Sequence, residues 1–161
     1  MRLIKWLVVL VLMVVCAAGG WVVGRFDVAT RAIPAASLPE RERAFAERLT
    51  NASLVGRFTV DGRADRPAAP DRYDISSVEK LDEGRWRFNV RMQHGAVDVT
   101  LPIVMPVEWV GDVPAIMVSH YAIPGLGTFS AHVVFEGHRY GGTWSSPTVG
   151  GHMFGLIERQ P

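Results

Sequence analysis

The side chains best suited to acid–base or metal chemistry in this chain are its five histidines, and their spacing forms no known motif. There is no HExxH sequence and no pair at the helical spacing of metal ligands, so no metal site is predicted. His94 and His138 fall in predicted turns, and His132 lies on the polar side of a predicted strand. His120 and His152 fall on predicted strands and could approach each other across them. One hypothesis is therefore an enzyme whose site is assembled around His120 and His152.

Other catalytic signatures are weaker still. The single cysteine, Cys16, lies in a hydrophobic N-terminal segment, which excludes a disulfide and a Cys/His zinc site in the folded domain. The run TWSS at 143–146 carries hydroxyls without a partnered base, and no GxSxG elbow occurs. The glycines of PGLGT at 124–128 lack the lysine and the strand–helix context of a P-loop. We therefore name no catalytic residue and no cofactor, and the sequence favours a non-enzymatic protein.

The most distinctive stretch is glycine-rich and aromatic, RYGGTWSSPTVGGHMFGLIE at 139–158. Glycine weakens a strand and often marks a bend or a close approach of two backbones. Two interpretations stay open. Glycines opposite aromatic rings let those rings fill the interior of a small barrel. Alternatively Tyr140, Trp144 and Phe154 line a pocket for a small apolar or amphipathic ligand.

The N-terminal segment 1–25 is predicted to anchor the chain in a membrane. Nineteen residues without a formal charge run from Trp6 to Gly24, and as a helix they span roughly 28 Å, close to a bilayer core. Arg2 and Lys5 precede them, which predicts a single pass with a cytoplasmic N-terminus and an extracytoplasmic domain. A cleaved signal peptide, cut near 17–20, is the alternative. A lipoprotein is disfavoured because no small residue directly precedes Cys16.

Charge argues against nucleic acid as a partner. Once the three basic residues of the segment 1–25 are removed, 14 basic and 16 acidic residues remain, a balance of about −2. Such a domain offers no basic surface to a phosphate backbone. The expected partners are a membrane, through residues 6–24, and either a small apolar ligand or a membrane protein.

After a juxtamembrane linker at 26–36, the domain is predicted to span 37–161 and to open with a short helix. Residues 37–40, SLPE, have the form of a capping box with proline in the first turn. The predicted helix runs to about Leu49 or Thr50. Leu38, Phe45 and Leu49 give it a narrow apolar stripe, which we expect to pack on the same domain.

From residue 53 the hydrophobic period changes from 3.6 to 2, which predicts strands. Glycine-containing turns separate nearly all of them. The fold class is therefore mainly β, an eight-stranded antiparallel meander that forms a small or incomplete barrel. The predicted strands are Leu54–Val60, Tyr73–Leu81, Arg85–Gln93, Val97–Trp109, Ala115–Ala122, Phe129–Phe135, Tyr140–Ser145 and His152–Arg159.

Two details refine this prediction. The long connection at 63–72, RADRPAAPDR, is expected to be an exposed loop. Pro102 and Pro106 lie four residues apart on the outward side of one strand, so their missing donors face the same neighbouring position. Because proline is scarce in central strands, the sheet should have an edge or a gap there.

The sequences LVGRFTVDG, RYDISSVEKL with RWRFNVRM, IPGLGTFSAHVVFEGHRYGGTW and GGHMFGLIE carry a resemblance that covers roughly Leu49 to Glu158. In them the chain resembles a family of uncharacterised, exported or membrane-anchored bacterial proteins. That resemblance implies a location and a domain extent but no activity. The domain also resembles lipocalins in shape. A helical turn is followed by Gly56-Arg57-Phe58, which open the first strand, and then by a meander. Lipocalins usually carry tryptophan where Phe58 stands.

The sequence thus predicts a membrane-anchored envelope protein with an exported β domain. Its expected role is that of a non-enzymatic binding or accessory module for a small apolar or amphipathic ligand, or for a membrane-protein partner. The alternative is an envelope enzyme with a site around His120 and His152.

Overall fold

The computed structural model describes residues 31–63, 67–82, 84–94, 97–123 and 127–161. The predicted anchor at 1–25 lies outside these residues, as does the first half of the predicted linker. Within the described ranges, no helix is long and apolar enough to span a bilayer.

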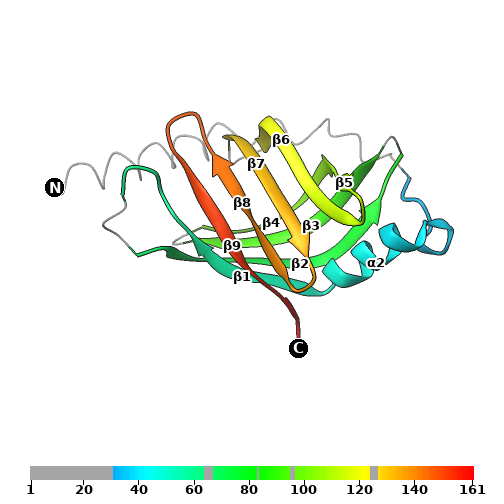
Figure 1. Ribbon diagram of the computed structural model, residues 1–161. Helices are drawn as coiled ribbons and strands as arrows, with labels where there is room; N and C mark the ends of the chain where they lie inside the picture. Colours follow the sequence, from blue (N-terminus) through cyan, green and yellow to red (C-terminus); the bar gives the residue numbers. More distant parts are fainter. Residues whose placement is uncertain (1–30, 64–66, 83, 95–96, 124–126) are drawn as a thin grey trace.

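The described chain is mainly β, as predicted, with one short helix (Figure 1). A 3₁₀ turn, η2 (Ala35–Ser37), precedes the helix α2 (Glu40–Leu49). The strands are β1 (Ala52–Phe58), β2 (Ala69–Lys80), β3 (Arg85–His94), β4 (Val97–Pro106), β5 (Glu108–Val110), β6 (Val113–Ile123), β7 (Gly127–Glu136), β8 (Arg139–Ser145) and β9 (Gly150–Arg159).

All nine strands form one antiparallel sheet in the order β4-β3-β2-β1-β9-β8-β7-β6-β5. The sheet curls until its two edges approach each other, and the Tyr121 hydroxyl on β6 donates to the Val104 carbonyl on β4. The result is a nearly closed, barrel-like sheet (Figure 1). The opening lies beside β4, the strand that carries Pro102 and Pro106, which confirms the predicted edge.

Two sequence predictions need correction at the element boundaries. The strand predicted over 97–109 is two strands, because the chain leaves β4 at Val107, which is buried, and pairs with β6 as β5. The loop predicted over 63–72 is shorter, since β2 already begins at Ala69 and Pro70 sits at its start, where proline is tolerated. Within the range predicted as a linker, Ile33 donates its N–H to the Lys80 carbonyl at 2.8 Å and packs against the core.

The predicted capping box is wrong. Pro39 is the N-cap of α2 and no side chain caps the helix. The Ser37 hydroxyl instead donates to the Pro34 carbonyl at 2.8 Å, within the 3₁₀ turn that precedes the helix. The helix ends at Leu49, as predicted, and Asn51 then takes a positive φ of 54° that turns the chain into β1.

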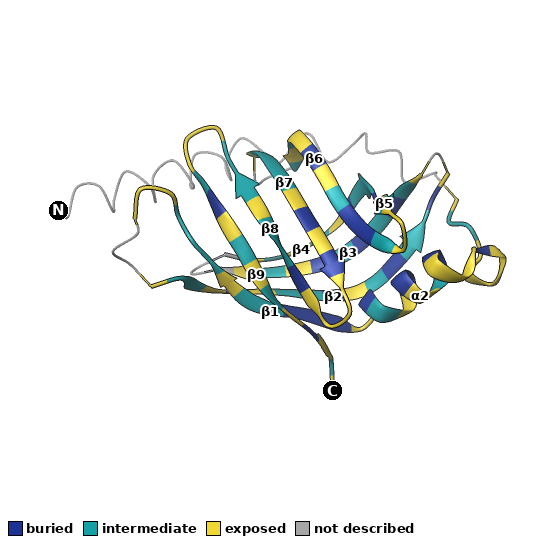
Figure 2. Cartoon of the chain, viewed as in Figure 1, coloured by how far each residue is buried: buried dark blue, intermediate teal, exposed yellow. Residues whose placement is uncertain are grey.

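The apolar stripe of α2 packs against the inner face of the sheet at one end, as expected. Phe45 is 1% exposed, and its ring makes edge-to-face contacts with four aromatic rings at centroid distances of 5.4 to 6.3 Å. These rings belong to Trp86 and Phe88 on β3, Trp109 on β5 and Phe135 on β7. Because three strands meet one side chain, α2 closes this end of the barrel (Figures 1 and 2).

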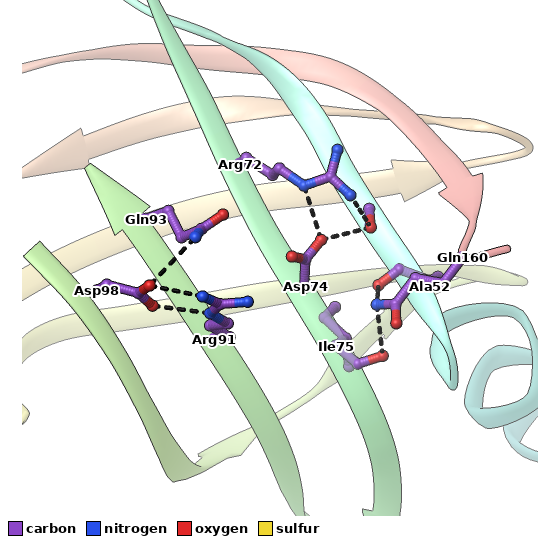
Figure 3. Close-up of polar contacts among 9 residues, drawn as sticks. Ala52, Arg72, Asp74, Ile75, Arg91, Gln93, Asp98 and Gln160 are labelled. Atoms are coloured by element: carbon purple, nitrogen blue, oxygen red, sulfur yellow. Dashed lines mark hydrogen bonds and ion pairs between the residues drawn. The ribbon is translucent and has the colours of Figure 1, made fainter. Parts of the chain in front are cut away.

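The outer face of β1–β4 is polar (Figure 3). Arg72 donates to the Asp74 carboxylate and to the Ser53 hydroxyl, both at 2.9 Å. Arg91 donates twice to Asp98, at 2.7 and 2.6 Å. This wall therefore keeps its charges paired and faces water.

Candidate functional site

The two ends of the barrel interior differ in how well they are covered. Successive side chains of a strand point to opposite faces, and buried or half-buried residues accordingly alternate with exposed ones along several strands (Figure 2). Inward side chains near α2 are buried, whereas those near the opposite end are only half-buried although most are apolar. The half-buried set includes Phe58, Tyr73, Met92, Leu101, Ala131, Trp144 and Met153. The interior is thus closed by α2 at one end and partly accessible at the other.

A row of four residues crosses the inner face where these two zones meet. Strand register places Asp71 on β2 opposite Gly56 on β1, Gly56 opposite Gly155 on β9, and Gly155 opposite Tyr140 on β8. A Cβ on Gly56 would lie 2.4 Å from the Tyr140 hydroxyl oxygen, and one on Gly155 would lie 2.8 Å from Cε1 of the same ring. The tyrosine ring therefore occupies the space that the two glycines leave. For Tyr140 this confirms the interpretation that glycines let aromatic rings fill the interior.

The Tyr140 hydroxyl is an unsatisfied polar group at the end of this row. The residue is 3% exposed, and its hydroxyl has no hydrogen-bond partner in the described part of the chain. Burial, together with the negative charge of Asp71, raises the pKa of Tyr140 to about 12. The hydroxyl therefore stays protonated at neutral pH and can donate a hydrogen bond.

Asp71 is the buried carboxylate of the site. It is 8% exposed and shares a hydrogen bond with the Tyr73 side chain two residues along β2. Burial raises the pKa of Tyr73 far above its usual value, and the charge of Asp71 and this hydrogen bond raise it further. Tyr73 is thus a neutral donor to the Asp71 carboxylate.

Trp144 supplies a second buried donor nearer the accessible end. It lies four residues beyond Tyr140 on β8, hence on the same face, opposite Gly151. Its ring packs edge-to-face on Phe58 with centroids 5.8 Å apart. A Cβ on Gly151 would lie 3.1 Å from the indole Nε1, and this N–H has no hydrogen-bond partner among the residues that the structure describes.

Phe154 does not join the other two residues of the predicted pocket. It is paired with Gly141, one position away from the Tyr140–Gly155 pair, so it points to the outer face, where it is 49% exposed. The three side chains therefore do not line one pocket, and only Tyr140 and Trp144 share a face. On the outer face Phe154 is one of several exposed apolar side chains of β6–β9, with Met117, Val134 and Leu156.

Both histidines of the alternative hypothesis, His120 and His152, are exposed. His120 lies in a bulge of β6 with φ 53°, where its backbone N–H donates to the Ser130 hydroxyl oxygen at 3.0 Å. His132 and His152 flank Thr143 across β7, β8 and β9, and line a shallow hollow of about 360 Å³ with Asp61.

This hollow does not include the pair that the sequence singled out. His152 lines it but His120 does not, so this hollow does not bring the two side chains together. Among the described residues, no group of three or more histidine, cysteine, aspartate or glutamate side chains could hold a metal ion.

Sequence reasoning missed Asp71 and Tyr73, because it placed them in or beside an exposed loop. The alternation of Asp71, Tyr73 and Ile75 was a signal that all three face one side of a strand.

Comparison of the chain with protein-family models, curated proteins and solved structures found no match. The fold and the site define the class: a barrel-like antiparallel β protein with one buried hydrogen-bond donor at the edge of its core and a second nearer the accessible end of its interior.

Proposed function

We propose that this protein is a membrane-anchored binding module that holds a small amphipathic molecule against the inner face of its barrel, at the end away from α2. The observation that carries the proposal is the pair of buried donors without acceptors, the Tyr140 hydroxyl and the Trp144 indole N–H. Both belong to one face of β8: Tyr140 lies at the edge of the buried core, and Trp144 lies among half-buried apolar side chains.

Energetics favour a bound molecule at this place. A buried donor left without an acceptor costs about 1–3 kcal/mol, which a ligand oxygen in its place would recover. Apolar side chains such as Met92 and Met153 supply contact area, and small-molecule sites commonly combine an apolar lining with few polar groups. The same arrangement assigns no acid–base pair or nucleophile, so the proposed role is binding rather than catalysis.

The setting of the module follows from the sequence. The uncharged stretch at 6–24 supports a single membrane anchor with the domain on the extracytoplasmic side. A domain tethered at a bilayer meets amphipathic molecules at high local concentration. A membrane protein that delivers or receives the molecule is the natural partner.

The test is native mass spectrometry with lipid extraction on the full chain, taken gently from the membranes of its own host. We expect a small apolar molecule at one copy per chain. Ala131 faces inward opposite Trp144, so Ala131→Phe should fill the site and remove the molecule. Thr143 precedes Trp144 on β8 and is exposed on the outer face, so Thr143→Phe is the matched control and should retain the molecule.

A wild-type chain that carries no molecule, and takes up none from a total lipid extract, would refute the proposal. Equal retention by Ala131→Phe and Thr143→Phe would place the molecule elsewhere and refute the assigned site.

A further inference from the structure

The inner face also restricts the chemistry of the molecule that it can hold. Resting on the proposed function, we propose that the ligand is uncharged and presents an oxygen acceptor, such as an ester, ketone or hydroxyl oxygen, to the Tyr140 hydroxyl. A carboxylate, a phosphate or an ammonium group is excluded from this position.

The acceptor requirement comes from the two unpartnered groups. An indole N–H can only donate, and a protonated phenol pairs with an acceptor by donating. Tyr140 and Trp144 lie four residues apart on β8, which at about 3.3 Å per residue is about 13 Å along the strand. One oxygen cannot serve both donors. An elongated molecule with acceptors at two positions, or with water at the outer one, fits this spacing.

A negatively charged head group is disfavoured by Asp71. The Tyr140 hydroxyl reaches across β9 to Gly56, and Gly56 is directly paired with Asp71. The Asp71 carboxylate is buried and already raises the pKa of the Tyr140 phenol through its charge. An anion that accepted a hydrogen bond from Tyr140 would lie next to a like charge in a poorly solvated interior, where repulsion is strong.

A positively charged head group fits the donors no better. An ammonium carries only donors, so it would leave both the Tyr140 O–H and the Trp144 N–H without an acceptor. The Asp71 carboxylate, for its part, already shares a hydrogen bond with Tyr73. Neutral oxygens, one at each position, pair with Tyr140 and with Trp144 without placing a new charge in the interior.

The test is direct competition among four probes with the same sixteen-carbon chain: methyl hexadecanoate, hexadecanol, hexadecanoate and hexadecylammonium. They are added together to the delipidated full chain and read by native mass spectrometry at neutral pH. We expect the two neutral probes to occupy the chain about tenfold more than either ion. Tyr140→Phe, which removes only the hydroxyl, should reduce occupancy by methyl hexadecanoate about fivefold, the effect of one neutral hydrogen bond. Thr143→Val, which removes an exposed outward hydroxyl of the same strand, should leave it unchanged.

The outcomes separate this inference from the proposed function. Preferential binding of hexadecanoate or hexadecylammonium would overturn the neutral-acceptor assignment while leaving a ligand-binding barrel. Equal binding of methyl hexadecanoate by wild type and Tyr140→Phe would overturn the role of Tyr140 in the same way. Failure of all four probes, together with the absence of a co-purified molecule, would defeat the proposed function itself.

Discussion

Replacement of Gly56 by alanine tests the packing that places Tyr140 inside the barrel. A Cβ at this position would lie 2.1 Å from the Phe154 carbonyl oxygen, 2.4 Å from the Tyr140 hydroxyl and 2.9 Å from the Gly155 Cα. Two of these atoms belong to the backbone of β9, so a change of side-chain rotamer cannot relieve the clash. The strands β1 and β9 would have to separate at the middle of the sheet.

We expect Gly56→Ala to destabilise the domain by about 3 kcal/mol, near the upper end of the usual cost of overpacking. For a domain of this size, about 3–5 °C of Tm per kcal/mol makes the loss roughly 10–15 °C. The matched control is Gly141→Ala on the adjacent β8, whose Cβ would meet no atom nearer than 3.8 Å. That variant should be neutral or gain up to about 1 kcal/mol, because alanine restricts the unfolded chain.

The assay is thermal unfolding of the full chain in detergent, followed by circular dichroism. A Gly56→Ala chain as stable as Gly141→Ala would refute the contact between the two glycines and Tyr140. It would also remove the basis for a hydroxyl held between β1 and β8.

The remaining predictions concern Phe45 of α2, the buried Tyr140 and the outer-face residue Phe154. Phe45→Ala should lower the free energy of unfolding by about 3–5 kcal/mol, because it removes the ring on which three strands converge; a calorimetric loss below about 1 kcal/mol would contradict this. Stability should fall as pH rises from about 10 towards 12, because the unfolded chain releases the Tyr140 proton near its usual pKa while the folded chain retains it to about 12. Tyrosinate absorbance during unfolding at each pH checks this, and a flat profile that Tyr140→Phe leaves unaltered would contradict it. Phe154→Ser should keep ligand retention within about twofold, since the side chain is half-exposed on the outer face; loss of the ligand on native mass spectrometry would overturn that placement.

The strands and most turns could be predicted because their signals are local. Alternating apolar residues over Arg85–His94 mark a strand with one buried face, and positive φ angles at Gly62, Gly84, Gly111 and Gly137 explain why glycine stands in those turns. The edge beside β4 was predictable for the same reason, since proline lacks a donor wherever it stands.

The site was predicted only in part because it depends on register between strands distant in the sequence. The spacing of Tyr140 and Trp144 places both on one face of a strand by itself. Whether Phe154 shares that face depends on how β9 is aligned with β8, which sequence alternation does not determine. Asp71 faces Tyr140 only across β1 and β9, so a pattern local to either strand carries no sign of it.

The central claim is that the buried donors of β8 hold the ligand, and the indole N–H resonance of Trp144 tests it most directly. The full chain, labelled with ¹⁵N at its five tryptophan indoles, is compared by NMR in lipid nanodiscs with and without methyl hexadecanoate, and Trp144→Phe identifies the resonance. The account predicts a downfield shift of the Trp144 N–H when the probe binds, with the N–H resonance of Trp86, buried near α2, unchanged. A bound probe that leaves the Trp144 resonance in place and moves that of Trp86 would contradict it.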